Sequence, residues 1–548
     1  MLFHALLWPF ARLRWARGVP SGAWITVEVD GRVVDFARRR RFWQFRRKQP
    51  LSLHALGRAV DAIVADTRVK GVLLTLKSFG AGMATATSLR TELARLRAAG
   101  REVVVHMPLG GDTKELYVAM AASKIYVGPQ ATLAPLGFST SVRYLKGALA
   151  KAGLEPEIFA RGEYKSAGEQ LVRDTMSERQ REQLEAIFEV FYAEMLLAIG
   201  EGRGVDRTHA KAIIDGAPYR AETAIEAGLV DGAAYEDEIT TLLDSRGKMV
   251  PLERYMRYLG ATKFGPIFPR PVIGVIMVHG AIATEGPMPF GAATDERLIA
   301  QIRGARSARR VRAVILHVDS PGGSALASDR IHHELVQLAK EKPLVACFSN
   351  VAASGGYYVA APAHVIVAQP TTITGSIGVV AARVVLGPLL EKLGVVTETV
   401  KRGARADMLD STRPFTADER IAFERELEGM YRAFVGIVAT GRKLSVEEVE
   451  KVAEGRVWTG SAAATRNLVD VLGGFEVALE RARNLVSPAG RKLEPVMLRG
   501  HLRGIPPLDP PAQAAKLLAR TLGIEGLSLL GGRERVLLWS PLASSIRT

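Results

Sequence analysis

The sequence predicts an α/β protein that contains two tandem copies of one domain. Its 548 residues exceed what a single hydrophobic core normally supports, so at least two domains are expected. β-branched strands alternate with amphipathic helices, which predicts parallel strands joined by right-handed crossovers. The stretch from Val69 resembles the stretch from Val311, since each reads as a strand, a glycine-bearing turn, a helix and a second strand.

The repeat continues without a gap further along the chain. YVAMAASKIYVGPQATLAPLGF from Tyr117 aligns with YVAAPAHVIVAQPTTITGSIGV from Tyr358, an offset of 241 residues (358 − 117). A long helix with a capping-box signature follows in each copy, SERQ at Ser177 and TADE at Thr416. Both copies close on a similar element, AIEAGLVD in the first and AATRNLVD in the second.

These boundaries predict four segments. The two repeats span residues 21–255 and 256–500, and each opens on a similar strand, WITVEVDGRVVDF or VIGVIMVHGAIAT. The Gly and Pro content of RYLGATKFGPIFPRP is typical of a linker between them. Residues 1–20 form an apolar and basic segment, and residues 501–548 form a tail with no predicted role.

Charge and composition exclude several classes of protein. The net charge of +16 is not accompanied by Cys/His zinc-finger spacing, an RNP pattern or a basic region followed by heptads. An anionic membrane surface is therefore favoured over nucleic acid as the partner. The apolar run near the N-terminus is about half the roughly 20 residues that span a bilayer. Neither a HExxH zinc site nor a Walker A loop is present, so we expect no metal and no cofactor. Cys347, the single cysteine, reads as a buried strand residue.

The two copies differ at positions that carry chemistry. The second copy has Ser354 in VAASGGYYVA, and the first has Thr113 at the matching position. Conversely, the first copy has Lys165 in GEYKSAGEQ, and the second has Ala406 there. One half therefore offers a nucleophile and the other offers a base.

A serine without a histidine partner can be activated by a neutral lysine. Burial disfavours the ammonium form, so Lys165 becomes a candidate general base for Ser354, the candidate nucleophile. Ser376 in TGSIG is placed to orient the amine. Backbone N–H groups of Gly355 and of Gly323 in DSPGGS are candidates for an oxyanion hole, with Gly322 as the alternative to Gly323.

These motifs together resemble a known family, the long, duplicated form of bacterial signal peptide peptidase A. DSPGGS, SNVAASGGYYVA, TGSIGV and GEYKSAGEQ occur in that family's order and in its halves, and the resemblance covers about residues 21 to 485. It implies two tandem ClpP/crotonase-like domains and a serine endopeptidase that degrades hydrophobic remnant signal peptides. It assigns Ser354 as nucleophile, Lys165 as general base and Ser376 as its orienting partner.

The resemblance also implies a homotetramer at the cytoplasmic membrane. Because the family's usual spanning helix is not evident at the N-terminus, we expect peripheral association, with the side of the membrane left open. Two alternatives stay open, a crotonase-like acyl-CoA enzyme and an inactive scaffold at the membrane. The first would need acidic catalytic residues near the glycine turns, and no such residues can be placed. The second conflicts with the retention of both Ser354 and Lys165.

Overall fold

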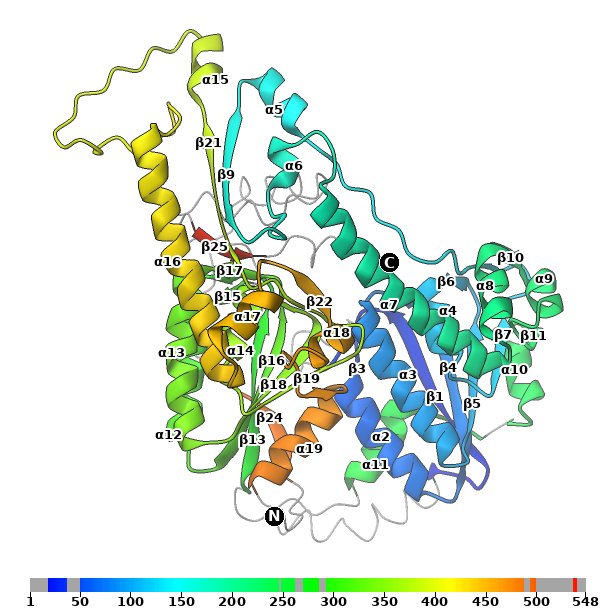
Figure 1. Cartoon of the computed structure of the whole chain (residues 1–548). Helices are drawn as coiled ribbons and strands as arrows, with labels where there is room; N and C mark the ends of the chain where they lie inside the picture. The colour runs from blue at the N-terminus through cyan, green and yellow to red at the C-terminus, as the bar shows by residue number, and fades with distance from the viewer. Residues whose placement is uncertain are drawn as a thin grey trace. The chain divides into compact units, whose positions relative to one another are not determined.

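The computed structural model describes residues 18–36, 50–245, 248–261, 270–284, 292–486, 493–498 and 536–539. They divide into two compact units (Figure 1). Unit 1 consists of residues up to Ser139 and Phe188–Arg270, and unit 2 consists of Thr140–Ile187 and the chain from Pro271. The basic N-terminal segment and most of the linker and tail lie outside the described residues.

The compact units divide the chain differently from the sequence repeats. Residues 140–187 fall within the repeat predicted at 21–255, yet they belong to unit 2 with the second repeat. The physical reason is a long antiparallel pairing, in which β9 (Glu155–Arg161) joins β21 (Val379–Val385) along its whole length. The segment that contains Lys165 is therefore part of the unit that contains Ser354.

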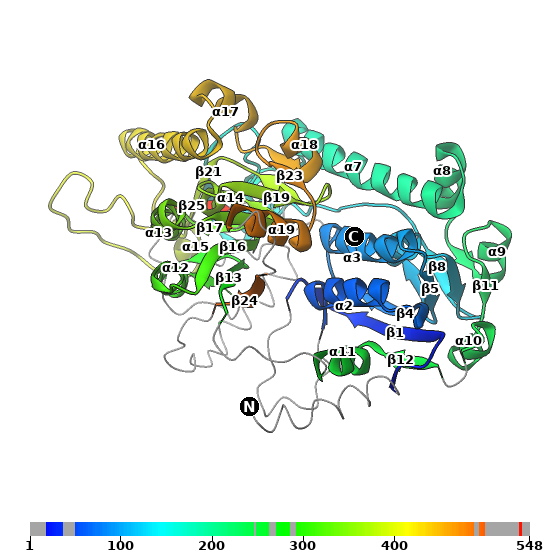
Figure 2. The same ribbon diagram turned by 90° about the horizontal axis from the view of Figure 1, so that it is seen from below.

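Unit 1 is built on a parallel sheet of order β11-β7-β5-β4-β1-β12. Helices α2 and α3 cover one face, and α10 packs against the other (Figure 2). The elements in chain order are β1 (Ala23–Gly31), β2 (Val33–Val34), β3 (Leu51–Ser52), α2 (Leu53–Ala65), β4 (Val69–Phe79), α3 (Met83–Ala98), β5 (Glu102–Met107), β6 (Gly110–Asp112), α4 (Thr113–Ala119), β7 (Lys124–Val127), β8 (Thr132–Ala134), α8 (Arg207–Asp215), β10 (Tyr219–Arg220), α9 (Ala221–Glu226), β11 (Gly232–Ala233), α10 (Glu236–Leu242), β12 (Met249–Pro251) and α11 (Leu252–Ala261). Helix α7 (Glu178–Arg203) begins in unit 2 and ends in unit 1.

Unit 1 also has a small sheet of order β10-β8-β6, and β2 pairs with β3. Unit 2 repeats the plan of a main sheet with smaller ones. Its main sheet has the order β22-β20-β18-β16-β13-β24, with β19 paired to β18 and β23 paired to β19, and a smaller sheet has the order β15-β14-β17-β25-β21-β9. The elements not yet bounded are α5 (Lys146–Ala152), α6 (Glu169–Val172), β13 (Val272–His279), β14 (Ile282–Ala283), β15 (Ala293–Thr294), α12 (Asp295–Ser307), β16 (Val311–Ser320), β17 (Gly322–Ser324), α13 (Ala325–Glu341), β18 (Leu344–Ala353), α14 (Gly355–Ala360), β19 (Val365–Ala368), β20 (Ile373–Gly375), α15 (Gly387–Lys392), α16 (Ala417–Arg442), α17 (Val446–Val452), β22 (Val457–Thr459), α18 (Gly460–Ala464), β23 (Val471–Leu472), α19 (Phe475–Val486), β24 (Glu494–Met497) and β25 (Val536–Trp539).

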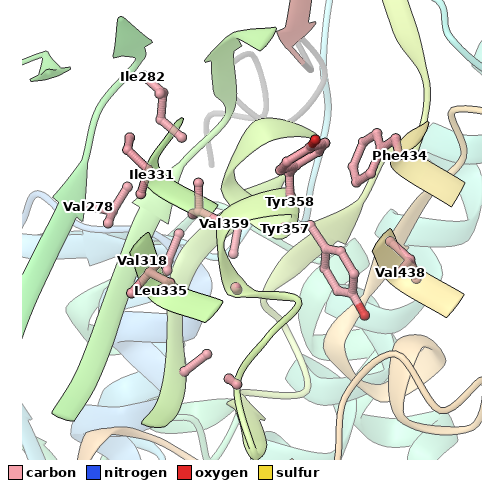
Figure 3. Close-up of a cluster of buried hydrophobic side chains, with 14 of the residues drawn as sticks. Val278, Ile282, Val318, Ile331, Leu335, Tyr357, Tyr358, Val359, Phe434 and Val438 are labelled. Carbon is pink, nitrogen blue, oxygen red and sulfur yellow. The ribbon is translucent and has the colours of Figure 1, made fainter. Parts of the chain in front are cut away.

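The core of unit 2 forms where these elements meet. Val278 and Val318 from the sheet pack with Leu335 of α13, and the ring of Tyr358 of α14 packs at a tilt against that of Phe434 of α16 (Figure 3). All of these side chains are buried. Because α14 is packed on several sides, the residue that precedes it is held in a rigid setting.

The predicted strand, turn, helix and strand from Val69 correspond to β4, α3 and β5, and those from Val311 correspond to β16, α13 and β18. The predicted capping box at Thr416 is present, since its side chain accepts from Glu419 N. Cys347 is buried in β18, as predicted.

Candidate active site

Ser354 lies at a sharp turn between β18 and α14. Its backbone has φ 54° and ψ −116°, a conformation that non-glycine residues rarely adopt. Such geometry costs of order 1–3 kcal/mol and persists only where the surroundings enforce it. Here Ser354 N donates to Gly375 O at 2.8 Å, and Tyr358 N donates to Ser354 O at 2.9 Å.

The two glycines after Ser354 are explained by the same turn. Gly356 lies against the end of β16, and a Cβ atom at this position would be 2.7 Å from the carbonyl oxygen of Ser320. Only glycine permits this approach. Gly355 is the first residue of α14, so its N–H has no acceptor within the helix and is free to bind negative charge.

Lys165 reaches Ser354 within unit 2. Its Nζ lies 2.8 Å from Ser354 Oγ, 3.0 Å from Ser376 Oγ and 3.0 Å from Ser376 O. All three residues are buried, and Lys165 is 4% exposed. Burial holds the pKa of Lys165 well below its ordinary range, because the charged amine would lose its hydration.

The three contacts fit a neutral amine. A carbonyl oxygen only accepts, so one N–H of Lys165 points to Ser376 O. A second N–H can be donated to Ser376 Oγ, which leaves the lone pair of the nitrogen facing Ser354 Oγ. The arrangement places a proton acceptor against a hydroxyl, as general-base activation requires.

Ser376 is held beside Lys165 by its own backbone. It has φ 52°, and its N–H donates to Arg456 O at 2.7 Å. Gly375, which precedes it, receives the N–H of Ser354. One short segment therefore fixes the positions of both Ser354 and Ser376.

The glycine turn at residues 322–324 distinguishes the two oxyanion candidates. Gly322 N donates to Ser320 Oγ at 3.2 Å, so its N–H is used inside the turn. Gly323 has φ 156° and would place a Cβ atom 2.0 Å from Ile282 O. Position 323 therefore requires glycine. The N–H of Gly323 is the better candidate for the second oxyanion-hole donor, beside the N–H of Gly355.

Sequence comparison of the two copies missed the residues that hold Lys165 in place. Tyr164 N donates to Glu454 O at 2.8 Å, and Gln183 Nε2 donates to Tyr164 O at 3.0 Å. Gly455 has φ 73°, and a Cβ atom there would lie 2.7 Å from Lys165 Cβ. Because these contacts join segments far apart in the sequence, no local motif identifies them.

Comparison with known proteins identifies relatives for both halves. A model of peptidase family S49 matches residues 95–249 and 336–487. The chain is 34% identical over 496 residues to "Serine protease SPPA, chloroplastic" from Arabidopsis thaliana, covering 88% of this chain and 72% of that protein. It is 32% identical over 452 residues to "Protease 4" from Salmonella typhi, covering 80% of this chain and 73% of that protein.

A ClpP1 mutant from Listeria monocytogenes aligns with 37% of this chain and 93% of its own length, at 14% identity and a TM-score of 0.24. The tandem α/β architecture is seen directly in the sheets of the two units, and the two family matches fall one in each predicted repeat. The match to both halves and the two relatives confirm the predicted duplication and the predicted class of enzyme. The chain belongs to peptidase family S49 and is a serine protease.

Proposed function

We propose that the chain is an endopeptidase in which Ser354 is the nucleophile and Lys165 is the general base. The observation that carries this proposal is the 2.8 Å separation of Lys165 Nζ and Ser354 Oγ in a buried setting. Burial lowers the pKa of the amine, so a neutral base exists at a lower pH than for an exposed lysine. Ser376 orients the amine through its two oxygens.

The reaction follows from these positions. Lys165 takes the proton of Ser354 as Oγ attacks the carbonyl carbon of the peptide, and the N–H groups of Gly355 and Gly323 bind the oxyanion that forms. The Lys165 ammonium then gives its proton to the leaving nitrogen as the C–N bond breaks. Water attacks the acyl-enzyme and gives a proton to Lys165, and the C–O bond to Ser354 breaks with return of that proton to Oγ.

We propose extended apolar peptides, such as remnants of signal peptides, as substrates. The residues next to Ser354 in sequence, including Ala352 and Ala353, are small and apolar, and these two alanines are buried behind the site. Proteins that bind extended peptides commonly pair the peptide main chain with one of their own strands, a mode of binding that favours extended substrates. A folded protein cannot present such a strand without unfolding locally.

Labelling with a fluorophosphonate and hydrolysis of a fluorogenic apolar peptide test the chemistry together. We expect labelling and turnover in the wild type, and loss of both in Ser354→Ala. Lys165→Ala should retain the fold by circular dichroism while its turnover falls by several orders of magnitude. Wild-type turnover in either purified variant would refute the dyad.

The substrate class needs a separate comparison. We expect cleavage of a synthetic apolar signal-peptide remnant to be faster than cleavage of a polar peptide of equal length, with a stably folded protein resistant. Equal rates for the two peptides would refute the apolar preference while leaving the dyad intact.

We further propose that four copies of the chain assemble and that the assembly associates peripherally with the cytoplasmic membrane. The net charge of +16 supports attraction to anionic lipid. Within the described ranges, the structure has no helix with the length and apolarity needed to cross a bilayer. Light scattering of the purified protein and sedimentation with anionic against neutral vesicles test these two proposals.

A further inference from the structure

A short segment that ends at Arg456 joins the two parts of the proposed site that hold the lysine amine. Glu454 O accepts the N–H of Tyr164, the residue before Lys165, at 2.8 Å. Arg456 O accepts the N–H of Ser376, whose two oxygens contact the amine, at 2.7 Å. The backbone of this segment therefore holds the lysine and the serine beside it at a fixed spacing.

The side chain of Arg456 makes a second connection to the same place. Its guanidinium lies over the ring of Tyr164, 4.6 Å from the centroid, and over the ring of Trp458, 4.5 Å from the centroid. Its Nη1 donates to Tyr164 Oη at 3.1 Å, and its Nη2 lies 2.8 Å from Glu182 Oε1. Tyr164 Oη in turn donates to Glu182 Oε2 at 3.0 Å, so these three side chains form a closed set of contacts.

The charge of Arg456 has a fixed partner and is partly shielded from water. The hydrogen bond from Tyr164 and the charge of Arg456 lower the pKa of Glu182, so its carboxylate is ionised. Arg179 also lies over the Tyr164 ring, 5.0 Å from its centroid, but its side chain is 50% exposed and that of Arg456 is 23% exposed. Because cation–π contacts are stronger where water is excluded, Arg456 holds the ring more firmly than Arg179 does.

The duplication indicates that the shared fold does not need this arginine. The closing elements AIEAGLVD and AATRNLVD align at an offset of 239 residues (470 − 231), which places Ala217 opposite Arg456. The preceding residue is glycine in both copies, and a short strand follows in both, β10 and β22. The arginine therefore occurs only in the copy that contains Ser354, as expected of a residue that serves the site.

We propose that Arg456 is a positioning residue for the general base. Its guanidinium holds Tyr164, and with it the backbone of Lys165, against the segment that also anchors Ser376. This inference rests on the proposed function, which takes Lys165 as the base. Loss of the guanidinium would free the Tyr164 ring on one side and let Lys165 Nζ move away from Ser354 Oγ.

The expected effect falls on kcat, because the guanidinium acts on the base and not on the bound peptide. A misplacement of about 1 Å costs about 100-fold in rate. The backbone hydrogen bonds of the segment remain when the Arg456 side chain is removed, so the displacement should be smaller. We therefore expect a loss of about tenfold in kcat at constant KM.

The first test compares Arg456→Ala with Arg466→Ala in hydrolysis of a fluorogenic apolar peptide. Arg466 is the matched control, because its guanidinium lies 3.9 Å from the centroid of the same Trp458 ring, while its hydrogen bonds go to Ala462 O and Thr465 Oγ1. We expect the kcat of Arg456→Ala to fall about tenfold and that of the control to stay within about twofold of the wild type. Each kcat is referred to the folded fraction, measured by near-UV circular dichroism.

A double-mutant cycle with Tyr164→Leu tests whether the arginine acts through the ring. Arg456→Ala should lower kcat about tenfold in the wild type and by less than about twofold in the Tyr164→Leu background. Arg456→Lys should recover part of the lost kcat, because it keeps a cation at the ring but lacks the planar fork that reaches both Tyr164 and Glu182.

A kcat of Arg456→Ala within about twofold of the control would overturn the proposal. So would equal losses in the two backgrounds of the cycle, because the arginine would then act by another route. A raised KM with unchanged kcat would also overturn it, since the arginine would then act on the substrate. The proposed function fails separately, because Lys165→Ala measured in the same series would then keep wild-type turnover.

Discussion

Gly455 offers a direct test of how closely Lys165 must be placed. It has φ 73°, and a Cβ atom at this position would lie 2.7 Å from both Cβ and N of Lys165. Ordinary contacts between carbon atoms are about 3.5–4.0 Å, so Gly455→Ala must displace Lys165 by about 1 Å. A matching shift of Nζ would lengthen its 2.8 Å approach to Ser354 beyond hydrogen-bonding distance.

A misplacement of about 1 Å costs about 10²-fold in rate, so we expect kcat of Gly455→Ala to fall about 100-fold. Gly394→Ala is the matched control, because Gly394 also has φ 73° and a Cβ atom there would meet nothing within 4 Å. Both variants carry the cost of a left-handed alanine, roughly 1–2 kcal/mol, and only Gly455→Ala is expected to move Lys165.

Steady-state hydrolysis of a fluorogenic apolar peptide, with thermal unfolding of each variant, measures both effects. We expect near wild-type kcat in Gly394→Ala and similar losses of stability in the two variants, with any excess in Gly455→Ala caused by its steric clash. If the kcat of Gly455→Ala stayed within about threefold of the control, the position of Lys165 would not limit the reaction.

The remaining predictions concern the charge and orientation of the base. Lys165→Arg should inactivate the enzyme, because a guanidinium stays protonated, and retained turnover would argue against a neutral base. Burial lowers the pKa of Lys165, so at pH values between that pKa and about 10.4 the unfolded chain binds up to one proton more than the folded chain. The free energy of unfolding should therefore rise with pH across this window, by up to about 1.4 kcal/mol per pH unit. Lys165→Met should remove that dependence in urea unfolding measured at several pH values, and an unaltered slope would contradict it. Ser376→Ala should lower kcat/KM about tenfold through the loss of one hydrogen bond of about 1.4 kcal/mol, and a wild-type value would exclude an orienting role.

Much of the fold and of the candidate site could be predicted because the duplication supplies an internal comparison. The strands and helices from Val69 and Val311 follow from local periodicity, which a single sequence carries. The comparison identifies Ser354 and Lys165 because the matching positions in the other copy hold Thr113 and Ala406. Their catalytic roles remain predictions, although the structure brings the two side chains together.

The assignment of residues 140–187 to unit 2 could not be predicted in the same way. The alternation of residue types in the sequence predicts that β9 is extended, but it does not predict which strand β9 pairs with. Its pairing with β21 joins residues more than 200 positions apart. The contacts of Glu454 and Gly455 with the lysine segment depend on that pairing, so they too required the structure.

The copy of the site in unit 1 shows why a serine alone would not restore chemistry there. Thr113 Oγ1 lies 3.1 Å from Gly137 O and 3.2 Å from Gly137 N, so its hydroxyl is engaged by backbone on both sides. The carboxylate of Glu115 is buried and accepts the N–H of Phe79 at 2.8 Å. The matching residue in unit 2 is Gly356, which has no side chain. A carboxylate that binds the backbone donor beside the glycine turn would repel a developing oxyanion, so we expect unit 1 not to support the reaction proposed for unit 2.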